Sequence, residues 1–241
     1  MYSVKLASIV IVCLAIVVTS ADAKEPVAKS QFFATGEVDA SRLLPPPPAD
    51  GSSRQKEELA ELHRIEEART PEALAQAKSD AANETVTMFS GVLGTSFDIA
   101  KLPATARLFA DIAQEEEAAT GPAKNFFHRA RPYSVDPSLN SCAGKSAKSA
   151  SGSYPSGHAT VAYAMGIVLA SLVPSHAQDI LKRASEFAEN RLVCGVHYRS
   201  DITAGETFGS VLAVDLLRKS NFQREYEGAE RELRAAHAAG L

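Results

Sequence analysis

Long apolar runs, an excess of basic charge and glycine-rich nucleotide loops are all missing from this sequence. The apolar run Leu6 to Val18 is shorter than the roughly 20 residues that a membrane-spanning helix needs. Lys and Arg number 25 against 29 Asp and Glu, so the formal net charge is −4, which argues against a nucleic-acid-binding protein. We find no internal repeat and no alternation of apolar and polar residues of the kind that strands show.

Cysteine is scarce, with Cys13, Cys142 and Cys194 only. Cys142 and Cys194 form an isolated pair, which is a disulfide candidate in an oxidising compartment. Two separate buried thiols are the alternative, because the sequence does not show whether the Cα atoms come within bridging distance. The pair lacks histidine partners at zinc-finger spacing, so no structural metal is expected.

The first 23 residues have the marks of a secretory signal peptide. Lys5 supplies the positive start, Leu6 to Val18 supplies the short apolar segment, and Ala21-Asp22-Ala23 fits the small-residue cleavage pattern. A retained membrane anchor is the alternative reading. Cleavage after Ala23 removes Lys5 and Asp22 together, so the net charge stays at −4.

Residues 24–53 are expected to form an N-terminal segment that ends in a proline-rich strap. Four consecutive prolines follow Leu43 and Leu44, and such a run is extended and stiff rather than helical. The two leucines suggest that the strap is held against a surface. Ser53 is a candidate cap for the helix that follows.

Residues 54–241 are predicted to form one all-α domain, a helical bundle. Apolar residues recur at helical spacing, and Thr70-Pro71 has the cap and first-turn proline of a helix start. The acidic triplet Glu115 to Glu117 is predicted to face solvent rather than bind a metal. Helices are expected at 56–69, from 71 onward, 88–102 with a turn, 103–119, 123–130, 156–173, 175–191, 201–217 and 221–239.

Three clusters of polar residues interrupt this helical pattern. The first has Lys124 and Arg131, which on a helix would share one face two turns apart. The second is the Pro155 to His158 stretch, where Ser156 is placed to cap an apolar helix and to leave backbone N–H groups pointing outward. In the third, Arg191, His197 and Asp201 lie within eleven residues.

Taken singly, each cluster has a plain structural explanation: an exposed basic face, a packed histidine, or a buried His–Asp pair. Taken together, they supply what phosphoryl transfer requires. Cations and oriented N–H groups stabilise the charge that spreads over the phosphoryl oxygens. One histidine can attack phosphorus while another protonates the leaving alkoxide. Guanidinium groups can supply the positive charge without a metal.

The ordered set K-x6-RP, PSGH and R-x5-H-x3-D resembles the phosphatase superfamily of bacterial acid phosphatases, lipid phosphate phosphatases and vanadium haloperoxidases, often called PAP2. Within it, the chain is similar to the secreted class A non-specific acid phosphatases. Members of that group also have a Leu-Pro-Pro-Pro-Pro segment, as at Leu44 to Pro48, and a Gly-Ser-Tyr-Pro-Ser-Gly-His run, as at Gly152 to His158. The resemblance extends over essentially the whole chain after the signal.

The resemblance implies a role for each matching residue. His197 would be the nucleophile that forms a phosphohistidine, Asp201 would orient it, and His158 would be the general acid. The remaining motif residues would bind the phosphate oxygens: Lys124, Arg131, Ser156, Gly157 and Arg191. Because His197 must be neutral while His158 is protonated, a bell-shaped pH profile with an acidic to near-neutral optimum is expected.

The resemblance also implies a periplasmic enzyme that hydrolyses small phosphate monoesters and uses no cofactor or metal. It implies a homo-oligomer, no nucleic-acid partner, no membrane association after signal cleavage, and a Cys142–Cys194 disulfide. One position departs from the family pattern, because Asn190 stands where the family usually has serine before the third-motif arginine. The larger amide is expected to alter phosphate affinity or leaving-group preference.

Several alternatives share the same motifs. A nucleotidase, an apyrase-like enzyme or a phosphotransferase would use the same site. A vanadate-dependent haloperoxidase is a further alternative, because vanadate mimics phosphate. A membrane lipid-phosphate phosphatase would need several spanning segments that this sequence lacks. A phosphate-binding protein without turnover would have no need of the ordered His197–Asp201 pair.

Overall fold

The computed structural model of the protein describes residues 29–94, 97–142 and 150–238. These residues form helices and loops with no strand, which confirms the predicted all-α class. The elements, in chain order, are α1 (Ala40–Leu43), α2 (Ser53–Ala68), α3 (Pro71–Ala81), η1 (Val86–Phe89), α4 (Ser90–Leu93), η2 (Ile99–Lys101), α5 (Pro103–Phe127), α6 (Pro132–Val135), α7 (Gly157–Leu172), η4 (Pro174–His176), α8 (Ala177–Val193), α9 (Arg199–Leu217) and α10 (Ser220–Ala238).

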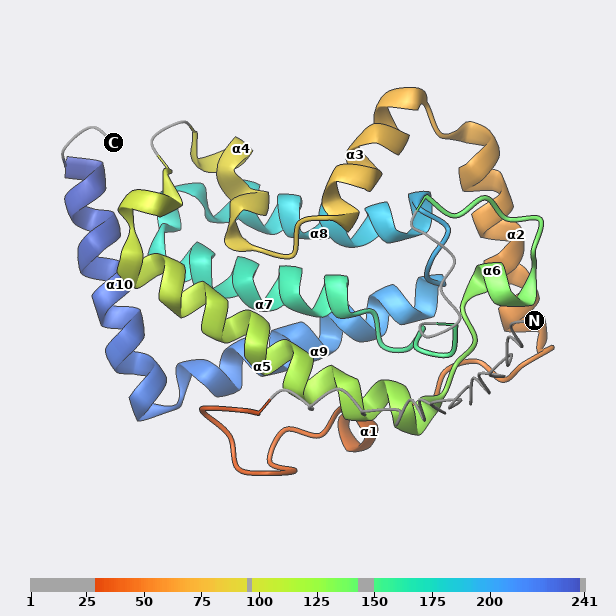
Figure 1. The fold of residues 1–241 in the computed structure, drawn as a ribbon, viewed down its shortest axis with the longest axis horizontal. Coiled ribbons are helices and arrows are strands. Elements are labelled where there is room, and N and C mark those ends of the chain that lie inside the picture. Colours follow the sequence, from red (N-terminus) through yellow and green to blue (C-terminus); the bar gives the residue numbers. More distant parts are fainter. Residues whose placement is uncertain (1–28, 95–96, 143–149, 239–241) are drawn as a thin grey trace, which may run out of the picture.

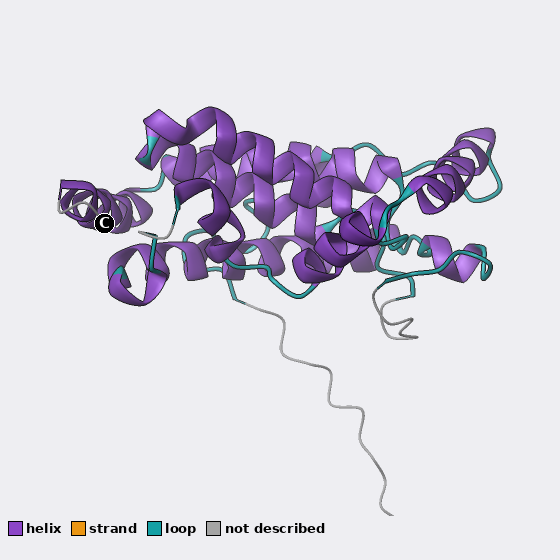
Figure 2. Ribbon diagram, turned by 90° about the horizontal axis from the view of Figure 1, so that it is seen from above, coloured by secondary structure: helices purple, strands orange, loops and turns teal. Residues whose placement is uncertain are grey.

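Helix α7 is the centre of the molecule (Figure 1). It has no Asp, Glu, Lys or Arg, and its side chains are buried on nearly every face, as expected for a helix that is apolar nearly all round. Helices α5, α8 and α9 pack around it, and α10 runs across one end, where it is seen almost end-on in Figure 2. The start of α7, the end of α8 and the start of α9 meet at the opposite end.

Two glycines allow α9 to approach α7 unusually closely. A Cβ added at Gly205 would lie 2.5 Å from the carbonyl oxygen of Ser156, and one added at Gly209 would lie 2.3 Å from that of Thr160. Real Cβ atoms do not come this close to backbone atoms, so both positions require glycine for the observed packing. The contact fixes the start of α7 against the start of α9.

Replacing Gly209 with alanine is expected to destabilise the fold by about 3 kcal/mol, because the new methyl group meets backbone that cannot rotate away. The matched control is Gly228→Ala in α10, where an added Cβ meets only Ala104 at 3.8 Å. That change should be neutral or stabilise the helix by up to about 1 kcal/mol. Urea unfolding measures both, and equal stability of the two variants would contradict the close-packing argument.

Helix α5 corrects the prediction of two helices separated at Gly121-Pro122. It is one helix of 25 residues with Pro122 inside it. The helix continues because Ala123 packs into the core at 2% exposure, and tertiary packing outweighs the hydrogen bond that proline removes. It ends at His128, which has a left-handed φ of 49°, so Arg131 lies beyond the helix and not on the same helical face as Lys124.

The acidic triplet on α5 was also predicted wrongly. Only Glu117 is exposed, whereas Glu115 and Glu116 are buried at 1% and 8% exposure. Glu115 accepts hydrogen bonds from the backbone N–H groups of Gln31 and Phe32, so it holds the N-terminal segment against α5. The stretch 88–102 differs as well, because it forms the short turns η1, α4 and η2 rather than one helix.

The proline strap lies against the start of the α7 region. Leu44 is buried at 6% exposure, whereas Leu43 is half exposed. The hydroxyl of Tyr154 donates a 2.7 Å hydrogen bond to the carbonyl oxygen of Pro45. Helix α2 is capped by Ser52, one residue before the predicted Ser53.

The expected signal peptide, residues 1–23, lies outside the described residues. Within the ranges that the structure describes, no helix combines the length and the apolarity that crossing a membrane requires.

Candidate functional site

The three sequence motifs meet at the N-terminal end of α7. Ser156 is fully buried and caps the helix, with its hydroxyl accepting from the N–H of Ala159 at 3.4 Å. Its own N–H donates to the carbonyl oxygen of Asp201 at 3.1 Å, which ties the PSGH motif to the third motif. The prediction that Ser156 starts a buried helix is confirmed.

Lys124 reaches this helix end from the last turn of α5. A Cβ added at Gly157 would lie 2.9 Å from Lys124 Nζ, so the glycine leaves room for the lysine beside the first N–H groups of α7. A cation next to unpaired helix N–H groups is a favourable place for an anion.

Arg131 and Arg191 bring two more cations to the site. Arg131 Nη1 donates to the carbonyl oxygen of Val196 at 2.9 Å and lies 3.1 Å from His197 Nε2. Arg191 is 4% exposed, and its Nε and Nη1 have no hydrogen-bond partner among the described residues. Burial, and then the nearby charge of Arg131, lowers the pKa of Arg191 to about 10, so it remains cationic at neutral pH.

His197 is buried with one ring nitrogen held and the other facing the cations. Nδ1 lies 2.8 Å from the carbonyl oxygen of Ser153 and 3.4 Å from Asp201 Oδ2. Both neighbours are acceptors, so Nδ1 carries the proton and Nε2 presents its lone pair. Burial first, and then the surrounding cations led by Arg131, lower the pKa of His197 well below its usual value.

Asp201 is fully buried at the third position of α9. It accepts from Arg129 Nη1 at 2.5 Å, from Ser153 Oγ at 2.6 Å and from the backbone N–H of Tyr198 at 2.8 Å. Burial raises the pKa of this carboxyl to about 6, and Arg129 opposes the rise. Asp201 Oδ2 lies farther from His197 Nδ1 than the carbonyl oxygen of Ser153 does. The backbone carbonyl and the carboxylate therefore position the imidazole ring jointly.

Behind Asp201 lies a buried chain of charges that begins on α2. Arg129 Nη2 donates to Glu58 Oε2 at 2.9 Å, and its guanidinium lies 4.0 Å from the ring centre of Tyr198. Glu58 Oε1 also accepts from the backbone N–H of Ser200 at 2.8 Å, which caps the start of α9. The side chains of Glu58 and Arg129 are each 1% exposed.

His158 projects from the first turn of α7 and is held by Glu84. Its Nδ1 lies 2.6 Å from Glu84 Oε1, and its Nε2 lies 3.3 Å from the carbonyl oxygen of Ala81. The ring stacks on Phe187 with centroids 5.8 Å apart. Burial lowers the pKa of His158, and the hydrogen bond to Glu84 opposes the shift.

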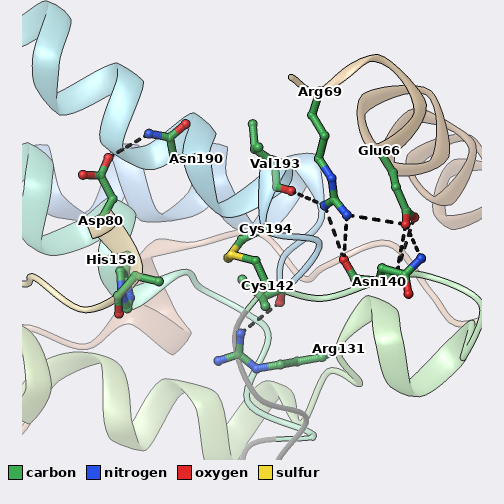
Figure 3. Close-up of a disulfide and its surroundings, with 12 residues drawn as sticks. Glu66, Arg69, Asp80, Arg131, Asn140, Cys142, His158, Asn190, Val193 and Cys194 are labelled. Carbon is green, nitrogen blue, oxygen red and sulfur yellow. Dashed lines mark hydrogen bonds and ion pairs between the residues drawn. A yellow bond between two sulfur atoms is a disulfide. The ribbon is translucent and has the colours of Figure 1, made fainter. Parts of the chain in front are cut away.

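Asn190 serves a contact that the sequence did not suggest. Its Nδ2 donates to Asp80 Oδ2 at 2.7 Å, and Figure 3 shows the amide pointing towards that carboxylate. Arg183 binds the same carboxylate with two nitrogens, at 3.0 and 2.6 Å. The amide therefore joins α8 to α3 beside the site.

Cys142 and Cys194 form a disulfide, with Cα atoms 4.7 Å apart, and this confirms the expected pairing. The N–H of Cys142 also donates to the carbonyl oxygen of Cys194 at 2.9 Å. Arg69 donates to the carbonyl oxygens of Val193 and Asn140, one on each side of the bridge (Figure 3). The loop that holds His197 is thus clamped covalently and by hydrogen bonds.

The PAP2 superfamily model matches residues 105–224, which contain all three motifs. An acid phosphatase of Zymomonas mobilis is 33% identical over 201 residues, which cover 81% of this chain and 76% of that protein. This chain belongs to the PAP2 superfamily. A non-specific acid phosphatase of Providencia stuartii is 30% identical over 201 residues, which cover 81% of this chain and 81% of that protein. The family resemblance inferred from the motifs is therefore confirmed.

Two solved structures share the PAP2 fold seen here. A bacterial vanadium-dependent iodoperoxidase superposes with a TM-score of 0.56 at 21% identity, over 75% of this chain and 53% of that one. This chain thus matches about half of the length of that protein. A transmembrane PAP2-type phosphatidylglycerolphosphate phosphatase from Bacillus subtilis superposes with a TM-score of 0.53 at 15% identity, over 73% of this chain and 87% of that one. At these identities the likeness concerns the fold alone.

Five residues that lie at or behind this candidate site were not predicted from the sequence: Glu58, Glu84, Glu116, Arg129 and Ser153. Two of them lie inside the quoted motifs, because Arg129 is within K-x6-RP and Ser153 is within the Gly-Ser-Tyr-Pro-Ser-Gly-His run. The position of these two polar residues inside a motif could therefore have identified them as site residues from the sequence. Glu58 and Glu84 come from other segments and have no fixed spacing to the motifs. Glu116 lies about two helical turns before Lys124 on α5, outside the motif itself.

Proposed function

We propose that this PAP2 protein is an acid phosphatase that hydrolyses small phosphate monoesters through a phosphohistidine at His197, without a metal. The observation that carries the proposal is Arg191, a buried cation with unpartnered Nε and Nη1 among the described residues. A buried guanidinium of this kind calls for an anion. Acid phosphatases are also among the relatives of the chain.

The phosphate group would bind with its oxygens towards the cations and the helix end. Lys124, Arg131 and Arg191 would neutralise the charge that develops on the oxygens. Ser156 and Gly157 would donate hydrogen bonds at the start of α7. Because these groups are held before substrate arrives, little reorganisation is needed during the reaction.

The first chemical step would form a bond from His197 Nε2 to phosphorus and break the bond from phosphorus to the ester oxygen. His158 would give its proton to the departing alkoxide, and the Nδ1 proton of His197 would stay between Ser153 and Asp201. In the second step, water would attack phosphorus while His158 takes the proton from that water. Cleavage of the N–P bond releases phosphate and restores neutral His197.

The expected pH profile follows from three groups. The depressed pKa of His197 keeps it neutral and nucleophilic through the working range. Asp201, with a pKa of about 6, loses its charge as the pH falls, which weakens its hold on His197. His158, with a pKa below its usual value, loses its proton as the pH rises. Activity should therefore be highest on the acidic side of neutrality and decline in both directions.

Export to the periplasm and a homo-oligomeric state are proposed as well. The Cys142–Cys194 disulfide supports export, because such bridges persist in oxidising compartments. The signal-like pattern of residues 1–23 gives independent support. Exposed apolar side chains at Leu43 and Phe126 are the surface on which an oligomer contact is proposed.

The decisive assay uses p-nitrophenyl phosphate with and without excess EDTA. Turnover should be unchanged by the chelator, because the cations of the site take the place of a metal, and it should be inhibited by vanadate, which mimics phosphate. Absence of turnover at every pH between about 4 and 8 would overturn the proposal. Loss of activity in EDTA that returns with a divalent cation would overturn its metal-independent part.

A further inference from the structure

The Glu116 carboxyl lies at the start of α7, beside the proposed phosphate-binding groups, and not in solvent as predicted for the acidic triplet. A Cβ added at Gly157 would be 2.9 Å from Glu116 Oε1 and equally 2.9 Å from Lys124 Nζ. The carboxyl and the ammonium therefore flank the first residue of α7 together. A carboxylate here would stand where the helix N-terminus and the cations favour a bound anion.

Polar and charged groups on α5, on the loop before η1 and on α7 lie around the Glu116 carboxyl. On α5, Thr120 donates a 2.7 Å hydrogen bond to Oε1, Lys124 attracts a negative charge and Glu117 repels it. Glu84, in the loop before η1, repels it too. His158 is the next residue on α7 after Gly157, and it is held by that same Glu84.

We propose that Glu116 is a proton-linked binding residue, whose carboxyl must be protonated for a phosphate dianion to bind beside Lys124 at the start of α7. The proposal rests on the phosphatase function argued above and adds a regulatory group to that site. As the neutral acid, Glu116 donates a hydrogen bond to a phosphate oxygen. As the carboxylate, it repels the dianion and competes with it for Lys124.

The direction of the pH effect follows from the environment. Burial raises the pKa of Glu116 to about 7, against the opposing charge of Lys124. Below this pH the group is neutral and binding is favoured. Above it, each pH unit should cost about tenfold in affinity, because a proton must be taken up with the ligand. Glu116 thus confines binding to acidic and neutral pH.

The experiment measures the Kd of tungstate from about pH 6 to about pH 9, because tungstate stays a dianion across this range, so its own ionisation does not enter. The variants are Glu116→Gln, which is neutral at every pH and keeps an acceptor for Thr120, and the exposed neighbour Glu117→Gln as the matched control. Above about pH 7, the slope of log Kd against pH should fall by about one in Glu116→Gln and stay unchanged in Glu117→Gln. Equal slopes in the wild type and Glu116→Gln would overturn the proposal.

A second variant changes the pKa of Glu116 without removing its carboxyl. Thr120→Val deletes the hydrogen bond that stabilises the carboxylate, so the loss of affinity should begin at higher pH. An unchanged or lower onset would contradict the inference. The proposed function is tested separately by turnover of p-nitrophenyl phosphate, so an inactive wild type that still binds tungstate would overturn catalysis and leave the proton linkage standing.

Discussion

Replacing His197 with alanine is expected to lower kcat/KM for p-nitrophenyl phosphate by about 10⁴-fold or more, because the attacking atom is lost. The attacking atom is His197 Nε2, which carries the lone pair and faces Arg131. The other ring nitrogen, Nδ1, is held by Ser153 and Asp201. Water could replace the nucleophile only with poor positioning and no covalent intermediate. Steady-state kinetics at the pH optimum measures the loss.

Controls separate the loss of chemistry from loss of the fold or of binding. His176→Ala, in η4 beyond the C-terminal end of α7, should retain wild-type activity. The His197→Ala variant should still bind tungstate, because the cations and the helix end remain. Rapid alkaline quenching should trap a phosphoenzyme in the wild type and none in the variant. Residual activity within tenfold of the wild type would exclude His197 as the nucleophile.

Replacing Arg129 with methionine should have the second large effect, a loss of about 3 to 5 kcal/mol in the free energy of unfolding. The change leaves two carboxylates, Glu58 and Asp201, buried at 1% exposure or less without their shared partner. Activity should fall as well, because the pKa of Asp201 is already raised by burial and Arg129 holds it down. The acidic limb of the rate profile should therefore move to higher pH.

Urea unfolding at neutral pH measures the stability change. Arg199→Met is the matched control, since Arg199 forms ion pairs with Glu61 and Glu189 but is 30% exposed, and its loss should cost less than about 1 kcal/mol. Adding Glu58→Gln to Arg129→Met should restore part of the stability, because one buried charge is removed. A cost for Arg129→Met no larger than the control would show that the buried chain of charges contributes little.

The sequence predicted those parts of the molecule whose signals are local. Thr70-Pro71 and Ser156 each mark a helix start by a cap, and both helices begin where the cap predicts. The apolar run after His158 predicted a buried helix, and α7 is the most enclosed helix of the described chain. The motif residues could be named because their spacing is fixed along the chain.

The rest depended on contacts between distant segments. Pro122 is a strong local signal for a break, yet the burial of Ala123 keeps α5 continuous. Glu58 lies 71 residues from Arg129, and no periodicity links the two. The burial of Glu116 likewise depends on where the start of α7 packs. Local rules have no access to such pairings, because the partner is chosen by the tertiary fold.

The N-terminal segment also has a bearing on the order in which the chain is made and folded. Glu37 pairs with Lys219 across 182 residues, and the ring of Phe32 packs edge-on against Phe222 at 5.3 Å. Lys219 lies just before the last helix and Phe222 lies within it, so these two contacts can form only after nearly the whole chain has been synthesised. Contacts of such long separation form slowly. The N-terminal segment is therefore expected to dock onto the helical domain late in folding.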